Sequence, residues 1–480
     1  QAAATVRTHG VTLDPGTAFN RVVGAAGFVF NGDTAIGTAT TTTRLMFGAP
    51  VALAGGTRTF TLFRNGTAAD QLVSGNEALK FMQQTDGPAV SVANGTLRVV
   101  ADGSVTSSFV SVSFDTLNGT PLPFNGNAGL TLGARVMGVL RADSPFGIVS
   151  GSVPRLSLEA GSYLSLSSGG TASYDASVFS LEGAGVVTNL DSNGGVATLS
   201  VLGSASTVFS GVLADGADVN ADLSLALAAG SVVKLTHAGN GVLSLTGANT
   251  YTGATTVTSG ILTAGVSTVG TASGAFGVGS NITINGGTVA LGSYNESVGT
   301  VTIGTNGGSI TGSGGILTAT TSYTFNNDSG HTASITAILA GSGVTLTQAG
   351  AGTTTLTGVN TYTGTTTISA GTLKLANTSG TTLPTTAAIS MTGSSGSAAT
   401  LDLAGYSQTI ASLNSATATY NTVTNSGVSS NAVLTIGGAS PGSFAGIIQN
   451  GTSTLGLTLN SSSGSGTLTL SGANTYTGVT

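Results

Sequence analysis

Asp215, Asp218 and Asp222 form the acidic group whose spacing is best suited to chemistry in this sequence, and Lys234 follows them closely. Carboxylate oxygens are the ligands that Ca²⁺ prefers, and a lysine whose pKa is lowered can accept a proton from a substrate. The group is therefore a candidate metal site or the candidate centre of a polysaccharide-active enzyme. A solvated acidic loop explains the same residues with fewer assumptions, and we favour it.

The remaining signatures of catalysis are weak. His9, His237 and His331 are far apart in the sequence, and none has a further ligand at the spacing of a metal site. Residues 328–331 read Asp-Ser-Gly-His and contain the residue types of a serine-hydrolase triad, but adjacent residues cannot converge as a triad requires. This tetrapeptide predicts a turn. We expect no catalytic residue, no metal and no cofactor.

Charge and composition exclude several classes of partner. Twelve basic and eighteen acidic residues give a net charge of −6, and all nine arginines lie between Arg7 and Arg155. Phosphate binding needs several basic side chains on one face, so we expect no nucleic-acid partner. The sequence has no cysteine and no run of about 18 apolar residues, which excludes a disulfide framework and predicts no transmembrane segment.

A five-residue element, Asn-Thr-Tyr-Thr-Gly, occurs three times and reveals a long internal repeat. The second copy lies 111 residues after the first, and the third lies a further 114 residues along. Its asparagines, tyrosines and glycines are Asn249, Tyr251, Gly253, Asn360, Tyr362, Gly364, Asn474, Tyr476 and Gly478. From about residue 175 onward the chain therefore consists of super-repeats of a little over 110 residues.

The tyrosines of this element have two interpretations. As exposed aromatic faces, Tyr251, Tyr362 and Tyr476 could stack on the sugar rings of a glycan. As structural residues, they would pack between the flanking threonines while each asparagine closes a turn. Copies more than 110 residues apart would lie about five coils apart in a solenoid, so they cannot form one contiguous patch. We therefore favour the structural interpretation.

The elements that would position these residues are short β-strands. Leu243 and Leu245 alternate with polar residues, which places one set of side chains inward and the other outward. Gly and Asn-Gly steps, which favour tight turns, interrupt such runs every six to twelve residues. Hairpin meanders also fit this local pattern, but the long repetition and the shortage of helix formers favour a solenoid. We predict a right-handed parallel β-helix with roughly 20 residues per coil.

The first third of the chain differs from the rest. Seven of the nine prolines and eleven of the sixteen phenylalanines lie before residue 155. We therefore divide the chain into an irregular N-terminal β region, residues 1–155, which caps the solenoid or carries an insertion, and a β-solenoid of residues 156–480. The segment from Asn76 to Gln84 is the best candidate helix, with Asn76 as its N-cap.

The scarcity of charge beyond residue 235 supports the solenoid. Only Glu296, Asp328, Lys374 and Asp402 are charged there. In a parallel solenoid each coil lies about 4.8 Å above the last, so surface residues stack in rows. Two like charges at this spacing repel by about 1 kcal/mol even in water. A surface of Thr, Ser and Asn avoids that repulsion.

Residues 465–480, which read SGTLTLSGANTYTGVT, and the related stretches 239–265 and 350–376 resemble a known bacterial repeat. It is the autotransporter-associated β-strand repeat, or passenger-associated transport repeat, of bacterial surface proteins. The resemblance is diffuse over residues 175–480 and does not extend to residues 1–155. It implies a β-solenoid passenger in an extracellular location or on the outer surface of a bacterium, and it carries no catalytic residues.

Three functions follow from these observations. The favoured one is a non-enzymatic cell-surface stalk or adhesin, which could bind surface glycans. The second is a subunit of an extracellular filament or surface layer that assembles with itself end to end or laterally, as the end of the chain inside a repeat at Thr480 indicates. The third is a polysaccharide-active β-helix enzyme that uses Asp215, Asp218 and Asp222.

Overall fold

The structure of this chain is a computed structural model. Before residue 92 it describes residues 6–8, 20–22, 28–30, 34–37, 45–47, 51–52, 57–63 and 79–82. From residue 92 onward it describes the chain except residues 94, 102–109, 116–123, 127, 142–144, 147–152, 168–171, 192, 217–229, 379–380, 418 and 463. Two compact units are present. The first unit is Gln1–Thr255 with Val269–Val278, and the second unit is Thr256–Thr268 with Gly279–Thr480.

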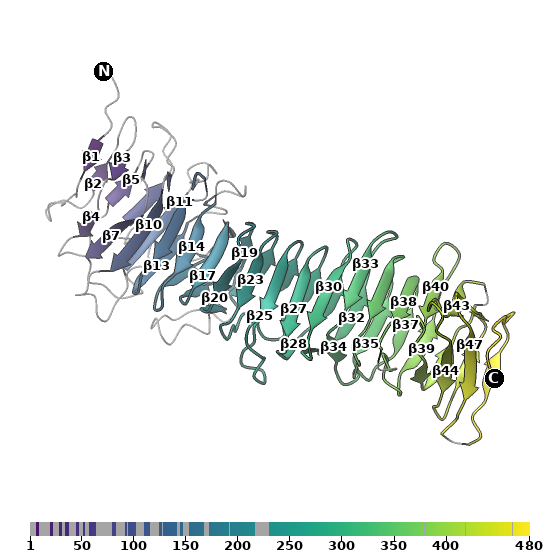
Figure 1. Cartoon of the computed structure of the whole chain (residues 1–480). Helices are drawn as coiled ribbons and strands as arrows, with labels where there is room; N and C mark the ends of the chain where they lie inside the picture. Colours follow the sequence, from purple (N-terminus) through teal and green to yellow (C-terminus); the bar gives the residue numbers. More distant parts are fainter. Residues whose placement is uncertain are drawn as a thin grey trace. The chain divides into compact units, whose positions relative to one another are not determined.

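Both units consist of short strands that pair in parallel with a strand one coil earlier and one coil later (Figure 1). Each pairing joins segments well separated in sequence, as when Leu130 pairs with Leu156 and Leu356 pairs with Leu375. Antiparallel pairing among the described residues is confined to isolated bridges. The predicted parallel β-solenoid is therefore confirmed, and the alternative of hairpin meanders is wrong.

The described residues of the first unit form four ladders of such strands. The longest two have eight strands each. One consists of β4 (Thr34–Gly37), β7 (Thr57–Phe63), β10 (Thr96–Ala101), β12 (Gly129–Leu132), β14 (Arg155–Leu158), β17 (Ser180–Gly183), β20 (Thr207–Phe209) and β23 (Val242–Leu245). The other consists of β2 (Asn20–Val22), β5 (Leu45–Phe47), β8 (Leu79–Met82), β11 (Val110–Asp115), β13 (Val136–Leu140), β15 (Tyr163–Ser165), β18 (Val186–Thr188) and β21 (Val212–Ala214). The shorter ladders are β1 (Val6–Thr8), β3 (Phe28–Phe30), β6 (Val51–Ala52) and β9 (Val92–Ala93), and β16 (Ala176–Val178), β19 (Val196–Val201) and β22 (Val232–His237).

The second unit repeats this arrangement. Its main ladder is β25 (Ile261–Ala264), β27 (Thr288–Gly292), β30 (Gly308–Gly312), β33 (Thr332–Ile335), β36 (Thr353–Leu356), β38 (Gly371–Leu375), β40 (Ala399–Asp402), β43 (Asn421–Thr424) and β46 (Ile447–Ile448). The other long one is β26 (Ile282–Ile284), β29 (Val301–Ile303), β32 (Ser322–Phe325), β35 (Thr345–Gln348), β37 (Thr366–Ile368), β39 (Ala388–Met391) and β42 (Ser412–Asn414). Short ladders are β28 (Glu296–Val298), β31 (Ile316–Ala319) and β34 (Ile338–Ala340); β41 (Gln408–Ile410), β44 (Ala432–Ile436) and β47 (Leu455–Leu459); and β45 (Gly442–Phe444) with β48 (Leu468–Leu470). β24 (Thr255–Val257) straddles the division between the units.

Alternation along each strand builds the core of the second unit. Because successive side chains point to opposite faces, aliphatic residues stack inside and hydroxyl residues stack outside. The inner column of the main ladder consists of Leu262, Val289, Ile310, Ile335, Leu356 and Leu375, all of them buried. An outer column of the other long ladder consists of Thr283, Thr302, Thr324, Thr347 and Thr367. The nearly uncharged composition thus corresponds to a dry aliphatic interior and a hydroxyl surface.

The coils are longer than the roughly 20 residues that we predict from the sequence. Paired residues in the main ladder of the second unit lie between 19 positions apart, for Leu356 and Leu375, and 28 positions apart, for Leu373 and Leu401. In the first unit the separation is 39 positions between Phe60 and Val99, and it reaches 41 positions between Val51 and Val92. The strands keep their register across these differences, so the additional residues lie in the loops between strands. Loops tolerate insertions because they contribute little to the core.

Aromatic residues fill the interior of the first unit where the sequence is rich in phenylalanine. Phe146 packs edge-on against Phe114, with ring centroids 5.1 Å apart, and against Phe124, at 5.5 Å. All three rings are fully buried. Wider coils need larger side chains to fill their interior at the density of a protein core. The eight-strand ladder that contains β12 and β14 continues across residue 155, where the sequence analysis divides the chain.

The predicted helix between Asn76 and Gln84 is wrong. Its centre is strand β8, which pairs in parallel with β5 and β11 and places Phe81 beside Phe47 and Phe114. Helix propensity is a weak preference that tertiary context overrides. Here the context is a pair of neighbouring strands with phenylalanine at the matching position.

Candidate functional site

The first copy of the repeated element joins three consecutive segments of the first unit. Asn249 follows β23 and is fully buried. Its side-chain Oδ1 accepts a hydrogen bond from the backbone N–H of Leu213 (2.7 Å), and its Nδ2 donates to the carbonyl of Ala275 (2.7 Å). Buried backbone groups need hydrogen-bond partners, and corners between strands leave some of them unpaired. The amide of Asn249 satisfies one donor and one acceptor there.

The second and third copies use the same bond to the preceding coil. Asn360 accepts from the N–H of Leu339 (2.9 Å), and Asn474 accepts from the N–H of Ile448 (2.9 Å). Asn360 also donates to the carbonyl of Thr382 (2.9 Å). The copies thus share one local geometry, and in the main ladder of the second unit five coil steps separate the strand after the first copy, β25, from the strand after the second, β38.

The tyrosines of the first two copies point into the core. Tyr251 and Tyr362 are fully buried, and each shares a 2.7 Å hydrogen bond with the hydroxyl of a threonine four residues later, Thr255 or Thr366. Burial raises the pKa of Tyr362 well above its usual range. Tyr476 makes the same contact with Thr480 (3.0 Å) but is partly exposed. The rings of Tyr251 and Tyr362 are therefore not accessible to a glycan.

The glycine of the element lies directly against the preceding coil. A Cβ atom at Gly253 would lie 2.2 Å from the carbonyl oxygen of Val233, and one at Gly364 would lie 2.3 Å from that of Val344. At Gly478 the corresponding distance to the carbonyl of Leu455 is 2.4 Å. The absence of a side chain allows this close approach, which any other residue would prevent.

Asp215 occupies an equivalent corner and is buried. It lies two residues after Leu213, whose N–H bonds to Asn249. Its Oδ1 accepts from the N–H of Val233 (2.8 Å), and its Oδ2 accepts from the N–H (3.0 Å) and hydroxyl (2.6 Å) of Thr252.

The same position in the other copies is filled differently. Two residues after Leu339, the carbonyl of Gly341 accepts from the N–H of Thr363 (3.0 Å). Two residues after Ile448, Asn450 accepts from the N–H of Thr477 (3.2 Å). Asp215 is therefore the acidic version of a corner that closes the coil onto the repeated element.

The acidic candidate group is only partly described. Asp218 and Asp222 lie outside the described residues. Lys234 lies on the outward face of β22 and is exposed, whereas Asp215 is buried, so these two residues do not converge. Among the residues that the structure describes, no three His, Cys, Asp or Glu side chains lie close enough to hold a metal ion.

A pocket of about 350 Å³ lies beside Asp215 in the first unit. Its walls are Asp215, Gly230, Ser231, Val232, Thr250, Thr252, Thr271, Ala272 and Val278. The segment Val269–Val278, which contributes three of these residues, belongs to the first unit although it follows β25 in the sequence. Sequence reasoning missed this pocket, because hydroxyl residues such as Thr250 and Thr271 are common throughout the chain.

The two histidines in the described part of the chain have structural surroundings. His331 donates its backbone N–H to the carbonyl of Asp328 (2.9 Å), which confirms the predicted turn. His237 is buried at the end of β22, and its Nε2 contacts the carbonyl oxygen of Gly241 (3.1 Å). Burial lowers the pKa of His237, because the charged imidazolium would lose its hydration. His9 lies outside the described residues.

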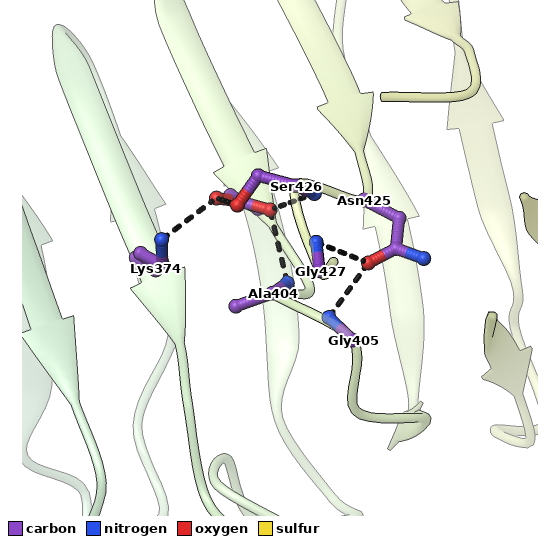
Figure 2. A network of polar contacts seen from close by, with 7 residues as sticks. Lys374, Ala404, Gly405, Asn425, Ser426 and Gly427 are labelled. Atoms are coloured by element: carbon purple, nitrogen blue, oxygen red, sulfur yellow. Dashed lines mark hydrogen bonds and ion pairs between the residues drawn. The ribbon is translucent and has the colours of Figure 1, made fainter. Parts of the chain in front are cut away.

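Two of the four charged residues in the second half of the sequence form a pair across neighbouring coils. Lys374 and Asp402 are in register on β38 and β40, with Nζ and Oδ2 3.8 Å apart (Figure 2). Asp402 also accepts hydrogen bonds from the N–H groups of Ala404 and Ser426, each at 2.9 Å. The 28-residue spacing of two opposite charges in an uncharged stretch is the sequence signal that could have indicated this pair.

Asn425 holds the adjoining corner in the same network (Figure 2). Its Oδ1 accepts from the N–H groups of Gly405 (2.6 Å) and Gly427 (3.1 Å). Its Nδ2 donates to the carbonyls of Ser430 (2.8 Å) and Thr454 (3.0 Å). All four bonds go to backbone groups, so the amide serves as a connector between coils. In both units these buried polar residues therefore stabilise coil corners.

These features define the class of the protein, a repetitive parallel β-solenoid whose recurring polar element joins one coil to the next. No helix in the described part of the chain has the length and hydropathy to cross a membrane. The passenger-associated transport repeat matches residues 235–264, 346–375 and 463–480, which contain the three copies of the element. The chain therefore contains three matches to the passenger-associated transport repeat.

One curated relative supports the assignment. The chain is 35% identical over 267 residues to the protein named "Adhesin BmaC autotransporter" of Brucella suis biovar 1 (strain 1330). The aligned region covers 52% of this chain and 7% of the relative, so the chain spans only a small fraction of that protein's length. No solved structure matches the chain.

Proposed function

We propose that this chain is a non-enzymatic segment of a bacterial surface protein, a β-solenoid stalk of the adhesin type that lies outside the cell. The observation that carries the proposal is the repeated Asn-Thr-Tyr-Thr-Gly element, whose polar groups bond to neighbouring coils in all three copies. Side chains engaged in this way have no capacity left for chemistry on a substrate. The element that recurs along the chain therefore connects one coil to the next.

The composition of the surface supports the same function. Columns of threonine, such as Thr302, Thr324 and Thr347, face outward in the second unit and remain hydrated without net charge. A hydroxyl surface of this kind is suited to display. The likeness to a protein named as an adhesin supports a role in attachment, and we propose surface glycans as one class of target.

Antibody labelling of intact cells of the source bacterium tests the location. Antibodies raised against the purified chain should label intact cells, and protease added outside should remove the label. A strain that lacks the coding segment is the control for specificity. Label that is seen only after the cells are permeabilised would contradict the proposal.

Attachment provides the second measurement. Deletion of the coding segment should reduce the number of cells retained on a surface that the parent strain colonises, and expression of the segment in place should restore it. Equal retention by both strains on every surface to which the parent attaches would contradict an adhesive role. Incubation of the purified chain with acidic polysaccharides should release no unsaturated ends. A release of unsaturated ends that depends on Asp215 would contradict the non-enzymatic stalk and would indicate an enzyme.

A further inference from the structure

A second corner recurs in the repeat, at the ends of strands β22 and β35. His237 ends β22 and Gln348 ends β35, and the 111 positions between them equal the shift between the first two copies of the Asn-Thr-Tyr-Thr-Gly element. Both residues are followed by Ala-Gly-X-Gly, where X is Asn or Ala. We call residues 237–241 the histidine corner and residues 348–352 the glutamine corner.

The backbones of the two corners make the same hydrogen bonds to the preceding coil. The N–H groups of the two residues after His237 donate to the carbonyl of Val201, at 2.9 and 3.0 Å. Those of the two residues after Gln348 donate to the carbonyl of Phe325, at 2.8 and 2.9 Å. The last glycine of each corner also donates to the preceding coil, at 3.4 Å in the first copy and 2.7 Å in the second. The corners are therefore equivalent in their backbones, and they differ in the side chain that begins each one.

The side chains of His237 and Gln348 are both buried and both bond to their own corner. The Nε2 of His237 lies 3.1 Å from the carbonyl oxygen of Gly241. Because a carbonyl oxygen only accepts, Nε2 carries the ring hydrogen in this bond, and Nδ1 is left as an acceptor. The Nε2 of Gln348 donates to the carbonyl of Gly350 (2.8 Å), and its Oε1 is left as an acceptor. Among the described residues, neither Nδ1 of His237 nor Oε1 of Gln348 has a hydrogen-bond partner.

Acid distinguishes the two side chains, because only the imidazole takes up a proton near neutral pH. The proton would go to Nδ1 of His237, which is buried. An imidazolium in this place would lose its hydration, so burial lowers the pKa of His237. In an opened corner the ring is hydrated and takes up a proton at the ordinary pKa of histidine. Protonation therefore favours the opened corner, while the amide of Gln348 stays neutral.

The charged groups around the histidine corner do not offset the charge of a protonated ring. Strands β19 and β21, which contact β22, and residues 202–206, which bond to the corner, contain no titratable residue. Lys234 lies on the outward face of β22 and is exposed. Asp215 accepts from the N–H of Val233, and the hydroxyl of Tyr251 bonds to a threonine hydroxyl. A proton on the ring therefore gains no opposite charge from these described residues.

We infer that the histidine corner is an acid-sensitive step of the solenoid, closed while His237 is neutral and opened when its ring takes up a proton. Opening breaks the hydrogen bonds to Val201, while the glutamine corner stays closed. The inference goes beyond the proposed function, because a surface stalk needs no response to pH. Its failure leaves the location of the protein and its role in attachment untouched, so the two proposals are tested separately.

Hydrogen exchange of the full chain at pH 7.5 and pH 5.5 tests the histidine corner. Exchange of the corner amides, corrected for the intrinsic effect of pH, reports the fraction of molecules in which the corner is open. Because the ring of an opened corner titrates near pH 6.5, that fraction should rise by up to about tenfold between these two pH values. The amides of the glutamine corner, measured in the same sample, are the internal control and should keep their protection.

Two reciprocal substitutions separate the histidine from a general effect of acid. His237→Gln gives the first corner the side chain that the second corner already has. It should abolish the pH dependence and retain the protection seen at pH 7.5. Gln348→His should give the glutamine corner the pH dependence of the histidine corner. Should Gln348→His leave its corner unprotected at pH 7.5, the comparison of the wild type with His237→Gln decides alone.

The outcomes decide the matter in either direction. A loss of protection at pH 5.5 in the wild-type histidine corner, absent from His237→Gln and from the wild-type glutamine corner, supports the inference. Equal protection of the histidine corner at both pH values, an equal loss in the wild type and His237→Gln, or an equal loss in both corners of the wild type would overturn it. A Gln348→His variant that is protected at pH 7.5 and remains so at pH 5.5 would overturn it as well.

Discussion

The first and second units use the same corner chemistry with different amounts of loop. In the second unit, paired residues of the main ladder lie 19 to 28 positions apart in the sequence, while in the first unit this separation reaches 41. The first unit holds most of the charge and the pocket beside Asp215. The second unit has almost no charge, and its Lys374 and Asp402 pair with each other.

This difference teaches which parts of a coil are fixed and which can vary. The inward aliphatic residues and the Asn-Thr-Tyr-Thr-Gly corner are common to both units. The aliphatic residues fill the interior of the coils, and the corner supplies hydrogen-bond partners to backbone groups of the preceding coil. The loops are free to lengthen, and the longer ones leave room for charges and cavities. A solenoid can therefore carry a pocket in one region while the coils beyond it keep the same pairing.

The largest effect should come from the buried tyrosines, and it should be equal in the two units. Tyr251→Ala and Tyr362→Ala each remove a fully buried ring and should lower the local free energy of unfolding by about 3–5 kcal/mol. Tyr476→Ala, at a partly exposed ring, should cost less than about 1 kcal/mol. Hydrogen exchange of the amides around each site measures the change. A small effect at Tyr251 alone would show that the two units differ in their corners as well.

The glycines should give the next largest effect. Gly253→Ala and Gly364→Ala place a Cβ within 2.2 and 2.3 Å of a carbonyl oxygen in the preceding coil, so we expect a loss of about 1–3 kcal/mol. At Gly437 the nearest atom to an added Cβ is 3.6 Å away, and Gly437→Ala is the matched control. Urea unfolding followed by circular dichroism measures all three. Equal stability of Gly364→Ala and Gly437→Ala would contradict the close contact.

Acid should destabilise the first unit through His237. Burial lowers the pKa of this histidine below 6.5 in the folded chain, so below pH 6.5 the unfolded chain binds a proton that the folded chain does not. Stability must then fall as the pH falls, by at most about 1.4 kcal/mol per pH unit. The difference between wild type and His237→Gln in urea midpoints at pH 7.5 and 5.5 measures it. Identical pH dependence in both proteins would contradict the assignment.

The smallest effect should come from the ion pair of the second unit, in which Lys374 is partly exposed and Asp402 is buried. Lys374→Ala removes a 3.8 Å contact but leaves Asp402 its hydrogen bonds from the N–H groups of Ala404 and Ser426, so it should cost less than about 1 kcal/mol. Lys374→Glu places two like charges in register and should cost about 1 kcal/mol more at low salt. Thermal melting at low and at high salt distinguishes the loss of the ion pair in Lys374→Ala from the added repulsion in Lys374→Glu. A charge reversal without cost would show that the second unit tolerates charge as the first does.

Much of this fold could be predicted from the sequence because it is repetitive. Alternation at Leu243 and Leu245, and the recurrence of Asn249 as Asn360, are local signals that parallel stacking amplifies in every coil. The buried, connecting position of the element could also be anticipated, since copies five coils apart cannot share a surface. The length of each coil could not be predicted from the sequence, because loop residues outside the strands produce no periodic pattern.

The remaining errors have physical causes. The sequence predicts a helix at strand β8 because Asn76 suits a helix N-cap, yet its neighbours β5 and β11 impose a strand. The pocket could not be predicted, because part of its wall comes from Val269–Val278, a segment of the first unit that follows β25 in the sequence. The pairing of Lys374 with Asp402 required the length of one particular coil. Strand β8, the pocket and the ion pair all depend on contacts between residues that are far apart in the sequence.

The most direct test of the account is the register of neighbouring coils. Because the sequence has no cysteine, Thr324→Cys combined with Thr347→Cys provides a disulfide readout with no background. These positions are partners on adjacent strands, about 4.8 Å apart, which is within the range of a disulfide. The solenoid predicts that mild oxidation joins them and leaves Thr324→Cys with Thr367→Cys, two coils apart, reduced. Equal oxidation of both pairs, or oxidation of the second pair alone, would contradict it.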